Sequence, residues 1–200
     1  PPSSAASDVY KRQIRAWAAE PGEYYHSFDG SYGGLWRRNG RPPQLLAGVG
    51  FSAQGKFEGS YYRRTTESRA PDLAWMFEGI EDQEILGDFG FSGGGAAGFE
   101  LDRADVRLGT PEEVRVVASS ENHTSSFVLV PEEMLTHITN WPGEEEQQKL
   151  IRSDIVYFRT PSGGEVFSTG SITFCGSLPW NDFDNNISRL LENVIRHFLQ

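Results

Sequence analysis

The sequence predicts an α/β fold, in which a layer of β-strands packs against at least one helix. Three observations support this prediction: β-branched runs of strand length at 112–120 and 125–130, a hairpin pattern over 154–174, and a helical apolar repeat over 187–199. The apolar faces of strands and helices have to be buried against one another, which a layered arrangement achieves. With 200 residues and 38% hydrophobic content, the chain can build one sizeable core or part of a larger one.

The first half of the chain is rich in glycine and aromatic residues and predicts few long elements. Glycine pairs and Pro42-Pro43 interrupt 14–43 too often for a long helix, so we expect irregular loop with short extended pieces. Segment 44–55 begins as a short apolar strand that breaks at glycines, and 73–80 is a compact apolar run of strand length.

The second half is more regular. Segments 112–120 and 125–130 are expected strands because they are rich in β-branched residues. Segment 131–138 starts with a proline followed by two acidic residues, which predicts a helix. The turn sequence 161–164 lies between two strand-like runs within 154–174 and therefore predicts a hairpin.

The last segment predicts a helix packed on the core. Its apolar residues recur at i, i+3, i+4, i+7, i+8, i+11 and i+12, which places them on one stripe of a helix. Asn185 or Asn186 can cap the first turn. The stripe consists of Ile187, Leu190, Leu191, Val194, Ile195, Phe198 and Leu199.

Charge and composition argue against several classes of partner. The formal net charge is −10 and is spread along the chain, which disfavours nucleic acid or an anionic membrane as the main partner. A single cysteine excludes an internal disulfide framework and fits a reducing compartment. No apolar stretch approaches the length of a membrane span, and no signal pattern is visible. We therefore expect a soluble, cytoplasmic protein.

Residues 1–13 are expected to form a disordered, non-native tail. The stretch SSAASDVYKRQ at 3–13 lacks apolar periodicity and resembles the direct translation of a transposase adapter used in short-read sequencing. The alternative is a natural disordered N-terminus. On the first interpretation the folded unit occupies 14–200, and the natural protein continues upstream of Ile14.

The stretch GGGAAGFELDRAD at 93–105 joins a glycine-rich run to four charges. Its glycines satisfy G-x-G-x-x-G, but no long apolar helix follows, so a nucleotide-binding loop is not predicted. Composition alone favours a tight turn with solvated charges. The alternative is an active-site wall, in which side-chain-free backbone admits a close neighbour while Glu100 points into a cleft.

Histidines and serines alone do not predict a site. The four histidines show no paired metal-binding spacing. Ser119 and Ser120 end a predicted strand but lack the G-x-S-x-G elbow of a serine nucleophile.

Several segments together resemble the large (β) subunit of N,N-dimethylformamidase and its relatives. They occur in the family's order and cover essentially all of 14–200. The segments are YYHSFDGSYGGLWR at 24–37, LLAGVGFSAQG at 45–55, GDFGFSGGGAAGFELDRADVRLGTP at 87–111, VVASSENH at 116–123 and DIVYFRTPSGGEVFSTGSITFCGSLPWNDFDNNISRLLENVIRHFL at 154–199.

This resemblance implies a fold, a reaction and a metal. The fold would be the C-terminal part of a class I glutamine-amidotransferase-like α/β domain, with a β-rich, loop-rich N-terminal portion. The implied reaction hydrolyses N,N-dimethylformamide to formate and dimethylamine with a mononuclear iron held by tyrosine and carboxylate ligands. Chain order places those ligands upstream of Ile14, so we expect no metal site in this chain. The implied partners are the upstream part of the large subunit, a small subunit and further copies in a homo-oligomer.

The resemblance also implies a catalytic residue. The family's glutamate in G-A-A-G-x-E-x-D-R falls on Glu100, where a carboxylate can orient water and pass a proton to the leaving amine. We expect Glu100 to be catalytic, with Asp102 or Arg103 fixing its rotamer. The alternative is a non-catalytic binding or subunit-assembly module, with the aromatic-rich segment 24–36 forming a carbohydrate-binding surface.

Overall fold

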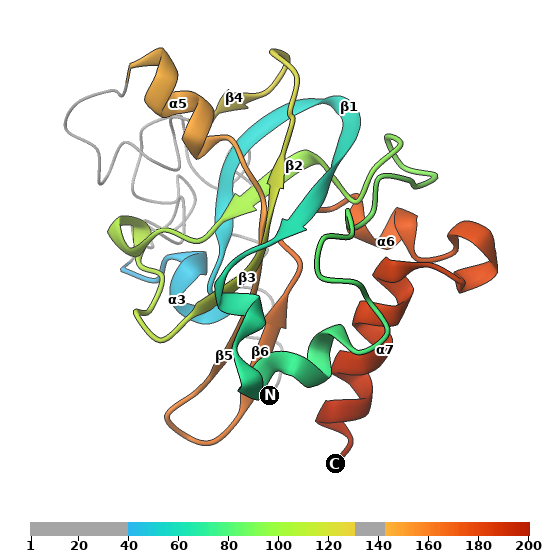
Figure 1. Cartoon of the computed structure of the whole chain (residues 1–200). Helices are drawn as coiled ribbons and strands as arrows, with labels where there is room; N and C mark the ends of the chain where they lie inside the picture. Colours follow the sequence, from blue (N-terminus) through green and yellow to red (C-terminus); the bar gives the residue numbers. More distant parts are fainter. Residues whose placement is uncertain (1–39, 131–142) are drawn as a thin grey trace, which may run out of the picture.

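A curled, antiparallel, six-stranded sheet forms the centre of the protein in a computed structural model that describes residues 40–130 and 143–200 (Figure 1). The strand order is β2-β1-β3-β5-β6, and β4 pairs with β1. The strands are β1 (Gly50–Arg64), β2 (Ala97–Arg103), β3 (Arg115–Glu121), β4 (Val128–Leu129), β5 (Asp154–Arg159) and β6 (Glu165–Ser168). The α-helices are α3 (Pro43–Ala47), α5 (Glu144–Leu150), α6 (Phe174–Ser177) and α7 (Asn186–Phe198). The 3₁₀ helices are η2 (Glu67–Arg69), η3 (Pro71–Phe77), η4 (Val106–Leu108) and η5 (Trp180–Phe183).

This architecture shows that the prediction of an α/β, glutamine-amidotransferase-like domain is wrong. Every strand pairing described is antiparallel, whereas an α/β domain requires parallel strands joined by crossover helices. Only α7 is a long helix within residues 40–130 and 143–200. Strand-like runs followed by a helix are compatible with both fold classes, because the pattern within one strand does not encode the direction of its neighbours.

Strand β1 gives the sheet its curl. Its last four residues, 61–64, pair with β3, whereas its earlier part pairs with β2 and β4. The register with β2 shifts between Gln54 and Gly59, and such bulges bend a strand and increase its twist. Beyond β6, Ser171 forms a bridge to Leu101 of β2. The two edges of the sheet therefore approach each other, and the sheet is a half-barrel.

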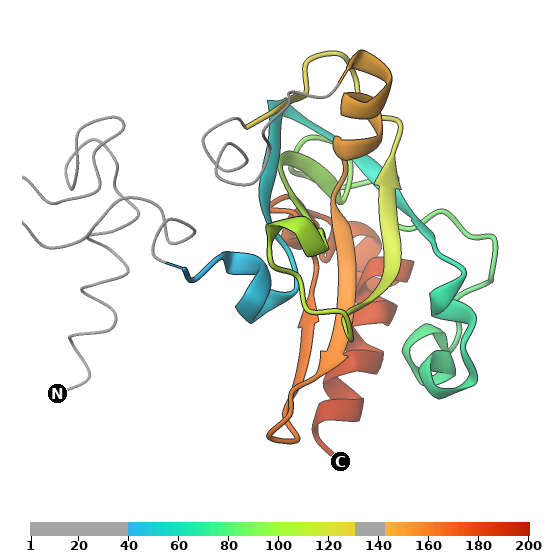
Figure 2. The ribbon, with the colours of Figure 1, turned by 90° about the vertical axis from the view of Figure 1, so that its left-hand side faces the viewer.

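Helix α7 packs along one side of the sheet, as Figures 1 and 2 show from two directions. The side-chain oxygen of Asn185 accepts an amide hydrogen of the first turn, which confirms one of the two predicted caps. The buried residues of the helix are Ile187, Leu190 and Val194, whereas Leu199 is 80% exposed. The predicted apolar stripe is therefore correct at its centre but too long at its C-terminal end.

Several shorter predictions have different outcomes. The hairpin is confirmed as β5 and β6, and the strand at 112–120 is confirmed as β3. The run at 125–130 contains only the two-residue strand β4. The predicted strand at 44–55 is wrong at its start, where α3 forms, and the predicted strand at 73–80 is wrong throughout, because η3 and a turn occupy it. Both helices have proline near their first position, and its fixed φ favours helix initiation. The expectations for 1–13, the loop up to residue 39 and the helix at 131–138 lie outside the described residues.

The core of the described residues consists of three clusters of buried side chains. The largest cluster joins β1, β3 and β5 to η3 and α7, and a second cluster joins β1 and β2 to β4 and α5. Prominent members of the first are Tyr62, Met76, Ile155 and Leu190, and members of the second are Ala53, Leu101, Phe127 and Leu150. Within the described ranges, no helix has the length and apolar character needed to cross a membrane.

Candidate functional site

The glycines of 93–98 allow the backbone of this segment to pack directly against the backbone of β1. A β-carbon at Gly95 would lie 2.3 Å from the carbonyl oxygen of Ser60, and one at Gly98 would lie 2.2 Å from that of Glu58. Both distances are far shorter than atomic contact allows, so any side chain here would push β1 away. Residues 91–94 form a turn. The close neighbour that these glycines admit is therefore β1.

Ser171 holds the opposite side of β2. Its Oγ accepts a hydrogen bond from the Gly98 amide at 2.8 Å and donates one to the Gly98 carbonyl oxygen at 2.9 Å. One residue earlier, the carbonyl oxygen of Gly170 accepts from the Asp102 amide at 2.8 Å. Strand β2 is thus fixed between β1 and the segment that follows β6.

Glu100 lies in β2 opposite Gln54 of β1 and is partly exposed. The residue before it, Phe99, has a φ of 60°, a left-handed conformation that costs a non-glycine residue about 1–2 kcal/mol. The ring of Phe57 packs edge-to-face against Phe99, with 5.6 Å between centroids. Within the described part of the chain, no hydrogen bond or ion pair joins another residue to the Glu100 carboxylate. Backbone strain of this kind is concentrated at functional sites.

Asp102 and Arg103 belong to opposite faces of β2, because side chains alternate along a strand. Arg103 is fully buried, and its guanidinium donates to the Leu150 carbonyl oxygen and to Asp105 Oδ2, both at 2.8 Å. Burial lowers the pKa of Arg103, and the contact with Asp105 opposes that shift. The described contacts of Arg103 thus connect β2 to α5 and not to Glu100.

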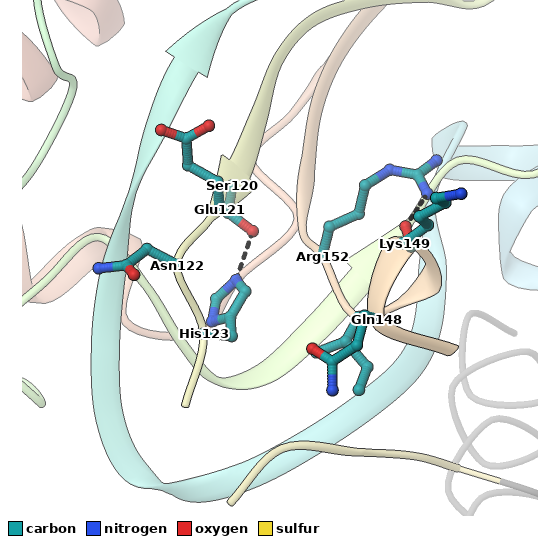
Figure 3. Close-up of a pocket in the computed structure, with 8 residues that line it drawn as sticks. Ser120, Glu121, Asn122, His123, Gln148, Lys149 and Arg152 are labelled. Atoms are coloured by element: carbon teal, nitrogen blue, oxygen red, sulfur yellow. Dashed lines mark hydrogen bonds between the residues drawn. The ribbon is translucent and has the colours of Figure 1, made fainter. Parts of the chain in front are cut away.

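A cavity of about 290 Å³ lies where β3 ends, beside the junction of α5 and β5 (Figure 3). Glu100 is not among its lining residues. Polar side chains dominate the wall, which consists of Ser120, Glu121, Asn122, His123, Gln148, Lys149, Ile151 and Arg152.

Ser120 and His123 form a hydroxyl–imidazole pair in this wall (Figure 3), with 2.6 Å between Oγ and Nε2. The same Oγ accepts the amide hydrogen of Ser153 at 2.7 Å, so its own hydrogen can be donated to Nε2. Burial lowers the pKa of His123 to about 4, which keeps the imidazole neutral at neutral pH. Its Nδ1 has no hydrogen-bond partner among the described residues. Without an acidic partner at Nδ1, the pair lacks the group that orients the histidine of a catalytic triad.

Sequence reasoning considered Ser120 and His123 separately and missed their pairing. They meet because Asn122, with a φ of 62°, turns the chain just after β3. Asparagine adopts this left-handed conformation more readily than most residues, and it is the one local signal of the turn.

The described residues do not fit the iron that the resemblance implies. Within residues 40–130 and 143–200, no group of three or more His, Cys, Asp or Glu side chains could hold a metal ion. His26 and the aromatic segment 24–36 lie outside these ranges. We therefore derive no chemical step through a metal from the residues that the structure describes.

Comparison with known proteins gives one family from both the family model and the curated relatives. Residues 3–186 match the family described as "N,N-dimethylformamidase beta subunit-like, C-terminal". Two curated relatives, the N,N-dimethylformamidase beta subunits of Alcaligenes sp and Paracoccus aminophilus, are each 40% identical over 187 residues. Each comparison covers 94% of this chain and 24% of the relative. The chain therefore spans about a quarter of the length of these curated relatives.

Proposed function

Because the chain belongs to the N,N-dimethylformamidase beta subunit-like, C-terminal family, we propose that it is part of an iron-dependent amidohydrolase. Its substrates would be small N-substituted amides such as N,N-dimethylformamide, which it would hydrolyse to formate and an amine. The supporting observation is 40% identity to two beta subunits over 94% of the chain. Their names refer to one subunit of a larger enzyme, so the proposal includes a further subunit. The iron would be bound by residues outside those described.

Glu100 is the proposed proton carrier. A carboxylate oxygen would take a proton from the attacking water and deliver it to the departing nitrogen as the C–N bond breaks. The partial exposure of Glu100 and its freedom from described ion pairs are compatible with this role. Asp102 shares its strand face two residues later and is proposed to orient it, while Arg103 would act indirectly by fixing β2 to α5.

The test is an assay of the full-length protein that contains this chain. The purified protein, loaded with iron, is incubated with N,N-dimethylformamide, and formate and dimethylamine are quantified along with bound metal. We expect the two products in equal amounts and a loss of turnover when iron is removed by a chelator. Absence of hydrolysis across a panel of small amides, with iron bound, would favour the non-catalytic alternative and contradict the proposal.

A further inference from the structure

Aromatic side chains gather on the surface of the molecule near α6 (Figure 1), where the loop before β2 meets the connection between α6 and α7. Trp180 packs against Phe91 with 5.3 Å between ring centroids and stacks on Phe89 at 5.9 Å. Phe91 is 70% exposed and Trp180 is 40% exposed, and Phe183 in the same 3₁₀ helix as Trp180 is 64% exposed. Apolar groups gathered on a protein surface often mark a site of interaction.

The fold fixes the two segments that carry these rings. The Phe91 amide donates to the Gly176 carbonyl oxygen at 2.9 Å. The side-chain amide of Asn185, whose oxygen caps α7, donates to the Trp180 carbonyl oxygen at 2.7 Å. Phe183 ends a run of three residues with positive φ, which a phenylalanine adopts only where its surroundings impose it. The rings are therefore held in place before any partner arrives.

Three carboxylates accompany the rings. Asp88, Asp182 and Asp184 are exposed and lie in the same two segments. None of them takes part in an ion pair described for residues 40–130 and 143–200. Segments 87–92 and 174–186 contain no Lys, Arg or His. We call Phe91, Trp180, Phe183 and these three aspartates the aromatic–acidic patch. Such a surface complements a partner that offers apolar side chains together with Lys or Arg.

A second copy of the chain does not fit the aromatic–acidic patch. A two-fold dimer would place the patch against itself, so its carboxylates would face one another. Those like charges would repel, and the formal net charge of −10 would add to the repulsion. The partner therefore has a different surface from that of the patch.

The curated relatives indicate where such a partner would come from. The chain spans about a quarter of their length, so most of each relative lies outside the matched region but in the same polypeptide. A segment in the same polypeptide has a high effective concentration, and a small patch is then enough to hold it. Contacts between domains of one chain are also more polar than permanent subunit interfaces, as this patch is.

We propose that the aromatic–acidic patch docks another part of the same polypeptide, outside these 200 residues, through a segment that carries apolar side chains and Lys or Arg. This inference goes beyond the proposed function because it depends neither on amide hydrolysis nor on iron. It assigns the patch a role in assembling the full-length protein.

The experiment is photocrosslinking in the full-length protein that contains this chain. Phe183 is replaced by p-benzoylphenylalanine, which keeps an aromatic ring and bonds to neighbouring C–H groups on irradiation. A denaturing gel separates crosslinks within one polypeptide from crosslinks between two, and mass spectrometry identifies the captured peptide. The matched control carries the same group at Phe57, which is 63% exposed and lies outside the patch.

We expect the group at position 183 to crosslink within one polypeptide, to a peptide outside these 200 residues that contains Lys or Arg. The group at position 57 should not capture that peptide. The double change Asp88→Lys and Asp184→Lys should lower the crosslinking yield about fivefold, because it places positive charge opposite positive charge. These two aspartates are chosen because neither has a positive φ. Glu112→Lys, at an exposed position outside the patch, should leave the yield unchanged.

Several outcomes would overturn the inference. Capture of a second copy or of a separate subunit would identify a different occupant. No crosslink from position 183, or capture of the same peptide from positions 183 and 57, would show that the patch has no docked segment of its own. An unchanged yield in the double variant, with a wild-type melting temperature, would contradict the charge complementarity. None of these results depends on turnover, so the proposed function stands or fails separately in its own assay.

Discussion

The substitution Gly98→Ala tests the role of the glycine-rich segment in the fold. The added β-carbon would lie 2.2 Å from the Glu58 carbonyl oxygen and 2.5 Å from the Gly59 α-carbon. Both neighbours are backbone atoms of β1, so no side chain can rotate away to relieve the overlap. On the other side, both hydrogen bonds of Ser171 to Gly98 resist a shift of β2.

The size of the effect follows from this geometry. Overpacking costs about 1–3 kcal/mol in general, and an overlap with backbone held on both sides belongs at the upper end, about 3 kcal/mol. Gly94→Ala is the matched control, because nothing lies within 4 Å of its added β-carbon and its φ is +84°. That variant bears only the left-handed penalty, about 1–2 kcal/mol, less a small gain from a stiffer unfolded chain.

Equilibrium unfolding in urea, followed by circular dichroism and tryptophan fluorescence, measures both variants against the wild-type chain. We expect Gly98→Ala to lose about 2 kcal/mol more than Gly94→Ala, which is more than a tenfold difference in the folding equilibrium. Equal losses in the two variants, or a loss below about 0.5 kcal/mol for Gly98→Ala, would refute the reasoning about close backbone approach.

Three further predictions concern the core and the cavity. Leu190→Ala should destabilise the chain by about 2–5 kcal/mol because Leu190 is fully buried, whereas Leu199→Ala should change stability by less than about 0.5 kcal/mol; similar losses in a urea titration would contradict the observed helix face. Folding favours neutral His123, whose pKa falls from 6.5 to about 4, so its contribution is complete above pH 6.5 and is lost as the pH falls towards 4. His123→Gln should flatten the pH dependence of the unfolding free energy in that interval, and an unchanged slope would count against this assignment. Arg103→Met removes the fully buried guanidinium and leaves the Leu150 carbonyl oxygen without that donor, while Asp105 keeps its contacts with Arg107, so we expect a loss of about 1–3 kcal/mol; a variant of wild-type thermal stability would show that the contact is dispensable.

Local elements were predictable where the chain's own pattern determines them. The repeat of Ile187, Leu190 and Val194 defines the buried side of α7, and turn residues define the hairpin of β5 and β6. Sheet architecture was not predictable in the same way. As isolated residues, Gly55 and Gly59 predict a break in the strand. β1 nevertheless continues through both, because glycine at these positions allows close contacts with Phe127 and with the backbone of Gly95. Such contacts join residues far apart in the sequence.

In the candidate site, too, the sequence identifies residues but does not predict their tertiary contacts. Resemblance to the family directs attention to Glu100, but the strain at Phe99 and its contact with Phe57 depend on a bulge in another strand. Arg103 appears in the sequence as a charge beside Glu100, whereas alternation along β2 and burial direct it towards Leu150. A sequence pattern gives residue types and spacing, and tertiary packing decides which of these residues meet.

The turnover of Glu100→Gln in the full-length iron-loaded enzyme shows directly whether this glutamate carries the proton. Glutamine keeps the shape of the side chain but cannot accept the proton, so we expect kcat for N,N-dimethylformamide to fall by about 10²–10⁴. Glu112→Gln, at an exposed position, is the control and should retain wild-type turnover. Wild-type kcat in Glu100→Gln, with iron content and stability unchanged, would show that Glu100 is not the proton carrier.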